Sequence, residues 1–132
     1  MRESGLGSTS GSSGDAWRPG SDAGLTTIYF DYDAASLRVD AKDGLKSNAG
    51  FLRSNPGSGV VIEGSCDERG SEEYNLALGM RRAEAARRYL VDLGIEASRL
   101  TTISFGEERP AQGGSSESAW AKNRRDDFKI RR

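Results

Sequence analysis

The sequence contains no histidine and only one cysteine, Cys66, among its 132 residues. Without histidine, a Ser-His-Asp triad and a Cys-His pair are both excluded. Without a second cysteine, an intrachain disulfide is excluded and the CxxC spacing of zinc sites is absent. The composition therefore predicts no metal site and no cofactor, and it gives no sign of an enzyme of these nucleophilic classes.

The chain also has little net charge and no long apolar segment. Its 19 basic and 20 acidic residues leave a charge of -1, whereas a general nucleic-acid binder needs a basic face, so we expect no nucleic-acid partner. Basic residues gather in the final stretch KNRRDDFKIRR, but two aspartates interrupt them, and we interpret this stretch as a solvated strand at a sheet edge. No apolar run approaches the roughly 20 residues of a membrane span.

The start of the chain, residues 1–24, is rich in glycine and serine and poor in apolar residues. Such a segment buries too little apolar surface to offset the entropy of ordering, so we predict a flexible tether or an artificial remnant. It also lacks the apolar segment of a signal peptide, so either a leader is missing from this form or the protein is cytosolic. We expect one folded domain in residues 25–132, and about 108 residues suffice for one modest core.

Apolar periodicity and turn residues predict an alternation of strands and helices. Gly94 and the Asn55-Pro56-Gly57 turn end the two long helices. The expected elements are a strand at 26–33, a helix at 37–52, a strand at 59–65, a helix from the cap Ser71 to about 93, a strand at 101–106, a short helix at 117–123 and a weak last strand. The order β-α-β-α-β-(α)-β predicts an α/β fold, a two-layer sandwich of one sheet and its helices.

Two polar residues of the second long helix fall on its buried face. At 100° per residue, Asn75 and Arg82 lie within the arc that Leu78 and Ala86 define, whereas Arg81 lies outside it. A charge on a buried face needs a partner, because burying it alone is costly. Asn75 and Arg82 therefore need a polar environment.

The nearest candidate partner of Arg82 is Asp67, with Glu68 beside it, in the turn before the helix. An arginine side chain leans toward the N-terminus of its helix, which would bring it to this turn. One interpretation is a salt bridge that fixes the turn. The other is a recognition pair for an amino-acid head group, in which arginine binds the carboxylate and aspartate the ammonium. The helix N-terminus would add donors for an anion.

Several stretches resemble the OmpA-like peptidoglycan-binding domain, and most closely its lipoprotein branch. The central one fits the pattern GxxDxxGxxxYNxxLxxxRA, and the similarity spans about residues 26–125. The stretches are TTIYFDYDAASLR, GFLRSNPG, VVIEGSCDERGSEEYNLALGMRRAEAARRYLVDLGI, ISFGEERPA and AKNRR. The resemblance implies a mixed four-stranded sheet in the two-layer sandwich.

The same resemblance implies a non-catalytic periplasmic domain that associates with the outer membrane and tethers it to the cell wall. The implied ligand is the diaminopimelate residue of the peptidoglycan stem peptide, whose free end carries an amine and a carboxylate on one carbon. It further implies a monomer, a Tol-system periplasmic partner, and membrane attachment only through an N-terminal lipid anchor absent from this sequence.

Site residues carried over from the resemblance come from three parts of the chain. Asp67 matches the family's aspartate in the turn after the second strand, and Arg82 matches the second residue of its Arg-Arg pair. The loop after the first strand contributes to the pocket, and two further residues support it. The predicted ligand-binding residues are Asp67, Arg82, Phe30, Asp31, Tyr32, Asp33, Ala34, Asn75 and Arg124.

The chain departs from the lipoprotein branch at Ser65, where histidine is usual, and at Cys66, where a small apolar residue is usual. Neither change removes the predicted charge pair. Asp126 and Asp127 stand where the family continues with an apolar strand, so the last strand is the least certain element.

Rival functions use the carboxylates. Asp31-x-Asp33 directly after an apolar strand resembles the haloacid-dehalogenase phosphatases, which pair an aspartate nucleophile with magnesium. Ala35 stands where that family prefers threonine or valine, and the chain is short for its fold. A hydrolase could instead pair Asp31 or Asp33 with Asp67 or Glu68. The same domain also occurs as the tail of outer-membrane barrels and of flagellar stator proteins, but the start of this chain resembles neither.

Overall fold

The computed structural model describes residues 17–131 and confirms the predicted order of elements. Short helix α3 has the predicted bounds, and the other elements lie within a few residues of theirs, except that β1 is much shorter than expected. The elements are β1 (Ile28–Tyr29), α1 (Val39–Ser54), β2 (Gly59–Ser65), α2 (Glu72–Asp92), the 3-10 helix η2 (Ala97–Arg99), β3 (Leu100–Gly106), α3 (Glu117–Asn123) and β4 (Arg125–Arg131).

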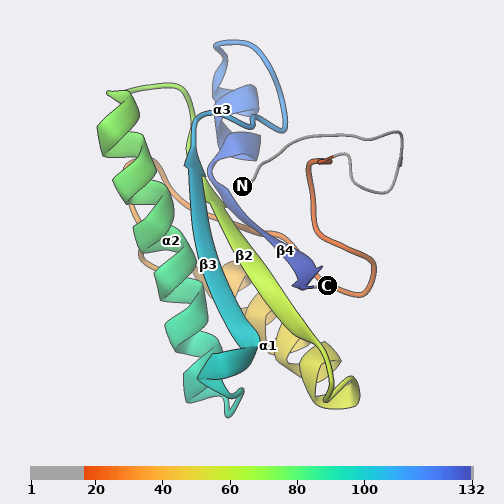
Figure 1. The fold of residues 1–132 in the computed structure, drawn as a ribbon. Coiled ribbons are helices and arrows are strands. Elements are labelled where there is room, and N and C mark those ends of the chain that lie inside the picture. Colours follow the sequence, from red (N-terminus) through yellow and green to blue (C-terminus); the bar gives the residue numbers. More distant parts are fainter. Residues whose placement is uncertain (1–16, 132) are drawn as a thin grey trace.

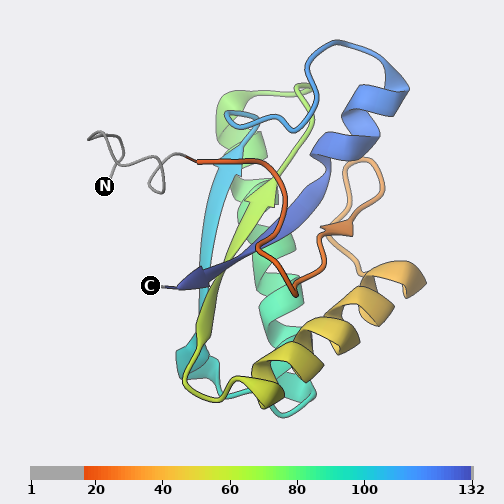
Figure 2. The ribbon, with the colours of Figure 1, turned by 90° about the vertical axis from the view of Figure 1, so that its right-hand side faces the viewer.

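The four strands form one mixed sheet in the order β1-β4-β2-β3. Strands β2 and β3 are parallel, and β4 is antiparallel to both β1 and β2. The parallel pair needs a crossover connection, which α2 provides. Helices α1 and α2 cover one face of the sheet, so the fold is the predicted two-layer α/β sandwich (Figures 1 and 2).

The prediction of a solvated edge strand at the C-terminus is wrong, because β4 lies between β1 and β2. Its residues alternate between the two faces of the sheet. Phe128 and Asp126 are buried, and Phe128 belongs to the apolar core. Asp127 is also buried and is held by hydrogen bonds from Arg125 (2.9 Å) and Thr27 (2.9 Å). These partners explain why a strand that begins with charges is found inside the sheet.

The apolar core fills the space between the sheet and the two long helices. Ser71 caps α2 as predicted, since its Oγ accepts a hydrogen bond from the backbone N–H of Tyr74 (3.1 Å). Gly94 follows the helix with φ +98°, a conformation that favours glycine. The buried core residues are Ile28, Phe30, Ala41, Leu45, Ala49, Leu52, Val60, Ile62, Ala83, Ala86, Leu90, Ile95, Leu100 and Phe128.

Two glycines allow α2 to lie very close to β2. A Cβ atom at Gly64 would lie 1.9 Å from the carbonyl oxygen of Gly79, and one at Gly79 would lie 2.3 Å from Ser104 Oγ. A side chain at Gly64 would meet backbone and would force the helix away, whereas one at Gly79 would first displace the Ser104 hydroxyl. This close approach brings the N-terminal half of α2 against the end of β2, where the predicted site residues lie.

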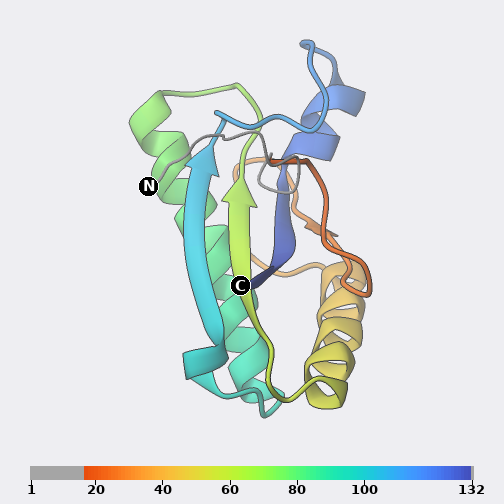
Figure 3. The same ribbon diagram turned by 45° about the vertical axis from the view of Figure 1, so that its right-hand side comes forward.

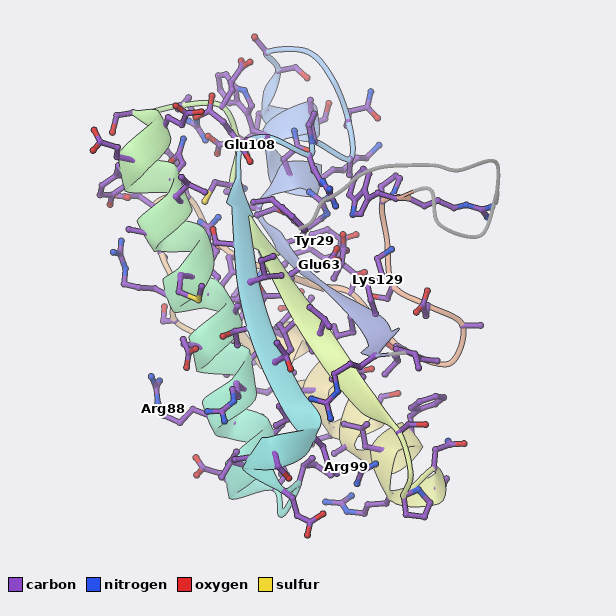
Figure 4. All side chains as sticks on the ribbon, in the orientation of Figure 1. Tyr29, Glu63, Arg88, Arg99, Glu108 and Lys129 are labelled. Carbon is purple, nitrogen blue, oxygen red and sulfur yellow. The ribbon has the colours of Figure 1, made fainter. Side chains whose placement is uncertain are left out.

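The N-terminal described residues run across the other face of the sheet (Figure 3). Trp17 Nε1 donates to Glu63 (3.2 Å), and the backbone N–H of Asp22 donates to the Phe128 carbonyl (2.9 Å). Glu63 and Lys129 lie on this face (Figure 4). Residues 1–16 of the predicted tether lie outside the described residues, and residues 17–24 contact the domain. None of the helices within residues 17–131 has the length and apolarity to cross a membrane.

Candidate functional site

A small pocket of about 150 Å³ opens between the end of β2, the start of α2 and the loop after β1. Its walls carry charged side chains of both signs and two tyrosine rings. The lining residues are Tyr32, Asp33, Cys66, Asp67, Arg69, Gly70, Tyr74, Asn75, Leu78 and Arg82. Five of the nine predicted site residues, those at positions 32, 33, 67, 75 and 82, are among them.

Arg82 is buried, with 1% of its surface exposed, as the helix periodicity predicts. Its guanidinium donates hydrogen bonds to three backbone carbonyls, those of Ala34 (2.8 Å), Ser65 (3.0 Å) and Asp31 (3.1 Å). Burial lowers its pKa below the ordinary value. A guanidinium has five N–H donors, so one N–H on each terminal nitrogen remains for another acceptor. Arg82 therefore joins the loop after β1 to the end of β2, and two of its N–H groups are left for another acceptor.

Asp67 is 4% exposed, and the guanidinium groups of two arginines lie close to its carboxylate. Arg69 contacts both of its oxygens, through Nη2 to Oδ2 at 2.8 Å and through Nε to Oδ1 at 3.2 Å. Arg124 Nη1 lies 3.7 Å from Oδ2. Burial raises the pKa of Asp67, but the Arg69 hydrogen bonds and the two positive charges outweigh it, so the pKa falls below its ordinary value.

The first of the two interpretations, a salt bridge between Asp67 and Arg82, is wrong, because the described residues show no such contact. In residues 17–131, the ion-pair partners of Asp67 are Arg69 and Arg124, and the hydrogen-bond acceptors of Arg82 are backbone carbonyls. Both side chains nevertheless line the same pocket. The salt bridge that fixes the turn is therefore made within the turn, by Arg69, and Arg82 is not needed for it.

The predicted residues of the loop after β1 differ in what they contribute. Tyr32 and Asp33 line the pocket, and Asp33 (φ +53°) accepts a short hydrogen bond from the Tyr74 hydroxyl. Phe30 is a core residue whose ring centroid lies 5.2 Å from Arg82 Cζ. The Asp31 side chain is exposed.

Three predicted residues, Asp31, Ala34 and Arg124, reach the pocket only indirectly. Asp31 and Ala34 supply carbonyls to Arg82, while the Asp31 carboxylate pairs with Arg38 outside the pocket (3.3 Å). Arg124 lies behind Asp67, where its Nε donates to the Phe30 carbonyl (2.9 Å).

Asn75 joins the turn before α2 to the loop after β3. Its Nδ2 donates to the Arg69 carbonyl (3.1 Å) and to Glu107 Oε1 (2.7 Å). Cys66 donates its thiol to the Asn75 carbonyl (3.2 Å), and burial raises the pKa of that thiol to about 11. A thiol with such a pKa stays protonated at neutral pH, so Cys66 acts as a small buried residue.

Three residues with polar or aromatic contacts near the pocket, Arg69, Tyr74 and Trp120, were not among the predicted site residues. The Arg69 guanidinium lies between two aromatic rings, 3.9 Å from the centroid of Tyr32 and 4.0 Å from that of Trp120. Tyr74 adds a hydroxyl at the pocket wall. An arginine two residues after an aspartate in a tight turn is a signal for such a pair, but the aromatic partners come from distant segments.

Asp126 lies buried on the helix-facing side of β4, and the positive charge of Arg82 acts on it. Neither of its side-chain oxygens has a hydrogen-bond partner among the described residues. Burial therefore raises its pKa well above the ordinary value, against the opposing influence of Arg82. In residues 17–131, no cluster of three or more His, Cys, Asp and Glu side chains is placed to hold a metal ion.

Comparisons with known proteins place this geometry in a family. The OmpA family model matches residues 29–124. The peptidoglycan-associated lipoprotein of Pseudomonas putida is 50% identical over 101 residues, which cover 76% of this chain and 60% of that protein, so the chain spans less than two thirds of its length.

Two solved structures are also similar. The crystal structure of the peptidoglycan-associated lipoprotein from Burkholderia pseudomallei is 42% identical, with a TM-score of 0.76 over 80% of this chain and 89% of that chain. The cell wall anchor of the T6SS from Pseudomonas aeruginosa is 27% identical, with a TM-score of 0.64 over 76% of this chain and 75% of that chain. The chain belongs to the OmpA family.

Proposed function

We propose that this domain binds the peptide stem of peptidoglycan without chemical turnover and so ties the outer membrane to the cell wall. The observation that carries the proposal is the placement of Asp67 and Arg82, two buried and opposite charges, in the wall of one small pocket. The names of the relatives from Pseudomonas putida and Burkholderia pseudomallei agree with it, as does that of the Pseudomonas aeruginosa anchor.

In this proposal the pocket receives the free end of a diamino acid, which carries an ammonium and a carboxylate on one carbon. The carboxylate takes the remaining N–H groups of Arg82, and the ammonium takes the acceptor position that Arg69 leaves on Asp67. Backbone groups of residues 31–34 contact the rest of the stem. Burial strengthens each of these interactions, because little water screens the charges.

A tip with both groups points to diaminopimelate as the ligand. Lysine and ornithine stems end in an amine alone, which would leave the free N–H groups of Arg82 without an acceptor and lower the affinity. For the whole protein we propose a periplasmic location, an N-terminal lipid anchor, a monomeric state and a Tol-system partner, all from its likeness to the lipoproteins.

The rival function, a hydrolase or phosphatase that uses Asp31 and Asp33, gains no support from the placement of these side chains. The Asp31 carboxylate pairs with Arg38 outside the pocket, and the Asp33 carboxylate accepts the Tyr74 hydroxyl within it. A catalytic pair of carboxylates needs both groups at one site. Asp33 and Asp67 do line one pocket, but the Asp33 carboxylate accepts the Tyr74 hydroxyl and the Asp67 carboxylate is bound by Arg69, so this pair gains no support either.

A pull-down on purified peptidoglycan sacculi tests the proposal. We expect the domain to sediment with sacculi whose stems contain diaminopimelate, to sediment much less with sacculi whose stems contain lysine, and to release no soluble fragments. Arg88→Gln controls for a general loss of positive charge, since this arginine is exposed on α2 and points away from the sheet (Figure 4). Equal failure to sediment with both kinds of sacculi would refute peptidoglycan binding, and released fragments would indicate an enzyme.

A further inference from the structure

Arg69 compensates the charge of Asp67 before any ligand arrives. Its side chain spans both carboxylate oxygens, and its backbone N–H donates to Oδ1 (3.0 Å). A carboxylate offers about four acceptor positions, so these three hydrogen bonds leave about one for a ligand. An incoming ammonium therefore meets a carboxylate that is largely engaged.

The Arg69 guanidinium is also held in place from both sides. The Tyr32 ring lies 3.9 Å away on one face and the Trp120 ring 4.0 Å away on the other. Trp120 is itself fixed, because its Nε1 donates to Glu68 Oε2 (3.1 Å). Such stacking suits the planar guanidinium and not the ammonium of lysine. If a ligand displaced Arg69 from Asp67, the arginine would lose its contacts with both rings.

Asp67 and the two arginines nearest to it therefore already have partners of opposite charge. Arg69 compensates Asp67, and Arg124 is shared between Asp67 and Glu117 Oε2 (3.1 Å), whereas the hydrogen-bond acceptors of Arg82 in residues 17–131 are neutral backbone carbonyls. Asp33 supplies the other negative charge of the pocket wall and is shared with a tyrosine hydroxyl. A ligand with an amine alone gains little from the compensated Asp67, whereas a ligand with a carboxylate gains from Arg82, whose present acceptors are neutral carbonyls.

We propose that Arg69 determines specificity: by compensating Asp67, it makes the pocket select stem peptides whose tip carries a carboxylate over those whose tip carries only an amine. This proposal rests on the proposed function and assigns to Arg69 a discrimination between two natural classes of stem. Specificity of this kind comes as much from disfavouring the wrong ligand as from binding the right one.

Calorimetry with two soluble muropeptides that differ only in the third residue of the stem, diaminopimelate or lysine, tests this role. The ratio of the two affinities is compared among the wild-type domain, Arg69→Gln, Arg69→Lys and the exposed control Arg88→Gln (Figure 4). We expect Arg69→Gln to lower the preference for diaminopimelate by at least about tenfold, chiefly because the lysine peptide binds better to the freed Asp67. Arg69→Lys should fall between, and Arg88→Gln should match the wild type.

An unchanged ratio in Arg69→Gln would overturn the proposal, and so would an equal loss of affinity for both peptides, which would mean that Arg69 only shapes the turn. If the wild type binds neither peptide, both this proposal and the proposed function are wrong. A melting curve of each variant checks the fold. If Arg69→Gln does not fold, Arg69→Lys decides, because it keeps the charge and loses the two-point contact with Asp67.

Discussion

The two halves of helix α2 both contribute buried side chains, but these side chains are chemically opposite. Toward its C-terminus the helix contributes Ala86 and Leu90 to an apolar core, and Leu90 is 0% exposed. Between its first turn and its midpoint it contributes Asn75 and Arg82, the latter 1% exposed, to a wall of polar groups. Apolar burial in the C-terminal half stabilises the fold, whereas Arg82 places a charge in the interior, where burial is costly unless its polar partners offset it. We call the C-terminal half of α2 the stabilising end, and we call the half that lines the proposed binding pocket the binding end.

Truncation of Leu90 at the stabilising end should give the largest effect. Leu90→Ala leaves a cavity where the side chain is fully buried, and we expect a loss of about 2–5 kcal/mol in the free energy of unfolding. Urea denaturation measures it, and Leu90→Met is the milder control, with an expected cost below about 1.5 kcal/mol. The affinity of the folded protein for a muropeptide should stay unchanged. A large loss of affinity would mean that the two ends are not separate.

Gly64 of β2, which faces Gly79 in the middle part of α2, should give the next largest effect. In Gly64→Ala the new methyl group would clash with the Gly79 carbonyl, so α2 must move away from β2. We expect a cost of about 1–3 kcal/mol in the free energy of unfolding. Binding should weaken as well, because Arg82 follows Gly79 by less than one turn. Gly57→Ala, where a Cβ has no neighbour within 4 Å, is the control.

The cap of α2 should have a smaller effect. Ser71→Ala removes the acceptor of the Tyr74 N–H, and we expect a loss of about 1 kcal/mol of stability. Ser71→Gly should cost only a few tenths of a kcal/mol, roughly, because glycine is tolerated at the cap. Thermal unfolding of both variants gives the comparison. Equal costs in the two variants would mean that the hydroxyl is not the stabilising group.

We also predict the direction in which stability changes with pH. Asp126 has a pKa raised by burial, so the folded state holds its proton more tightly than the unfolded state does. Its contribution to stability is therefore full below the ordinary carboxyl pKa and is lost as the pH rises through the raised value. Asp126→Asn removes this dependence, and its melting temperature should gain on the wild type between pH 4 and pH 8.

Asp127→Asn is the contrast to this variant, since Asp127 is held by hydrogen bonds from Arg125 and Thr27. That substitution should destabilise the domain at neutral pH, because it weakens a charged and buried hydrogen-bond group. If both variants gain stability with rising pH, the distinction between the two aspartates is wrong.

The sequence predicted the long elements well because their periodicity reflects one buried face. The same periodicity placed Arg82 and Asn75 on the buried side of α2. It failed for β4, where Asp126 and Asp127 suggested an exposed edge although both are buried. The partners of Asp127 lie in the N-terminal segment and in the strand itself, and no local pattern reveals the first of them.

The site was predictable in its members but not in its contacts. The sequence assigned Asp67 and Arg82 to one pocket, but it left open whether they pair with each other. Three arginines, Arg69, Arg82 and Arg124, lie close enough in the fold to compete for Asp67, and only the tertiary arrangement decides which of them contacts it. The two rings that hold Arg69 come from segments far apart in the chain, which no spacing argument links.

The most direct test of the binding end is calorimetry of Arg82→Lys and Arg82→Ala with a muropeptide that contains diaminopimelate, alongside the melting temperature of each variant. Our account predicts that Arg82→Ala loses about 2–5 kcal/mol of binding free energy, because a ligand carboxylate then enters a buried pocket without its partner. Arg82→Lys should lose less, since it keeps the charge but not the planar set of donors. Wild-type affinity in a folded Arg82→Ala variant would contradict the claim that this pocket binds the peptide tip.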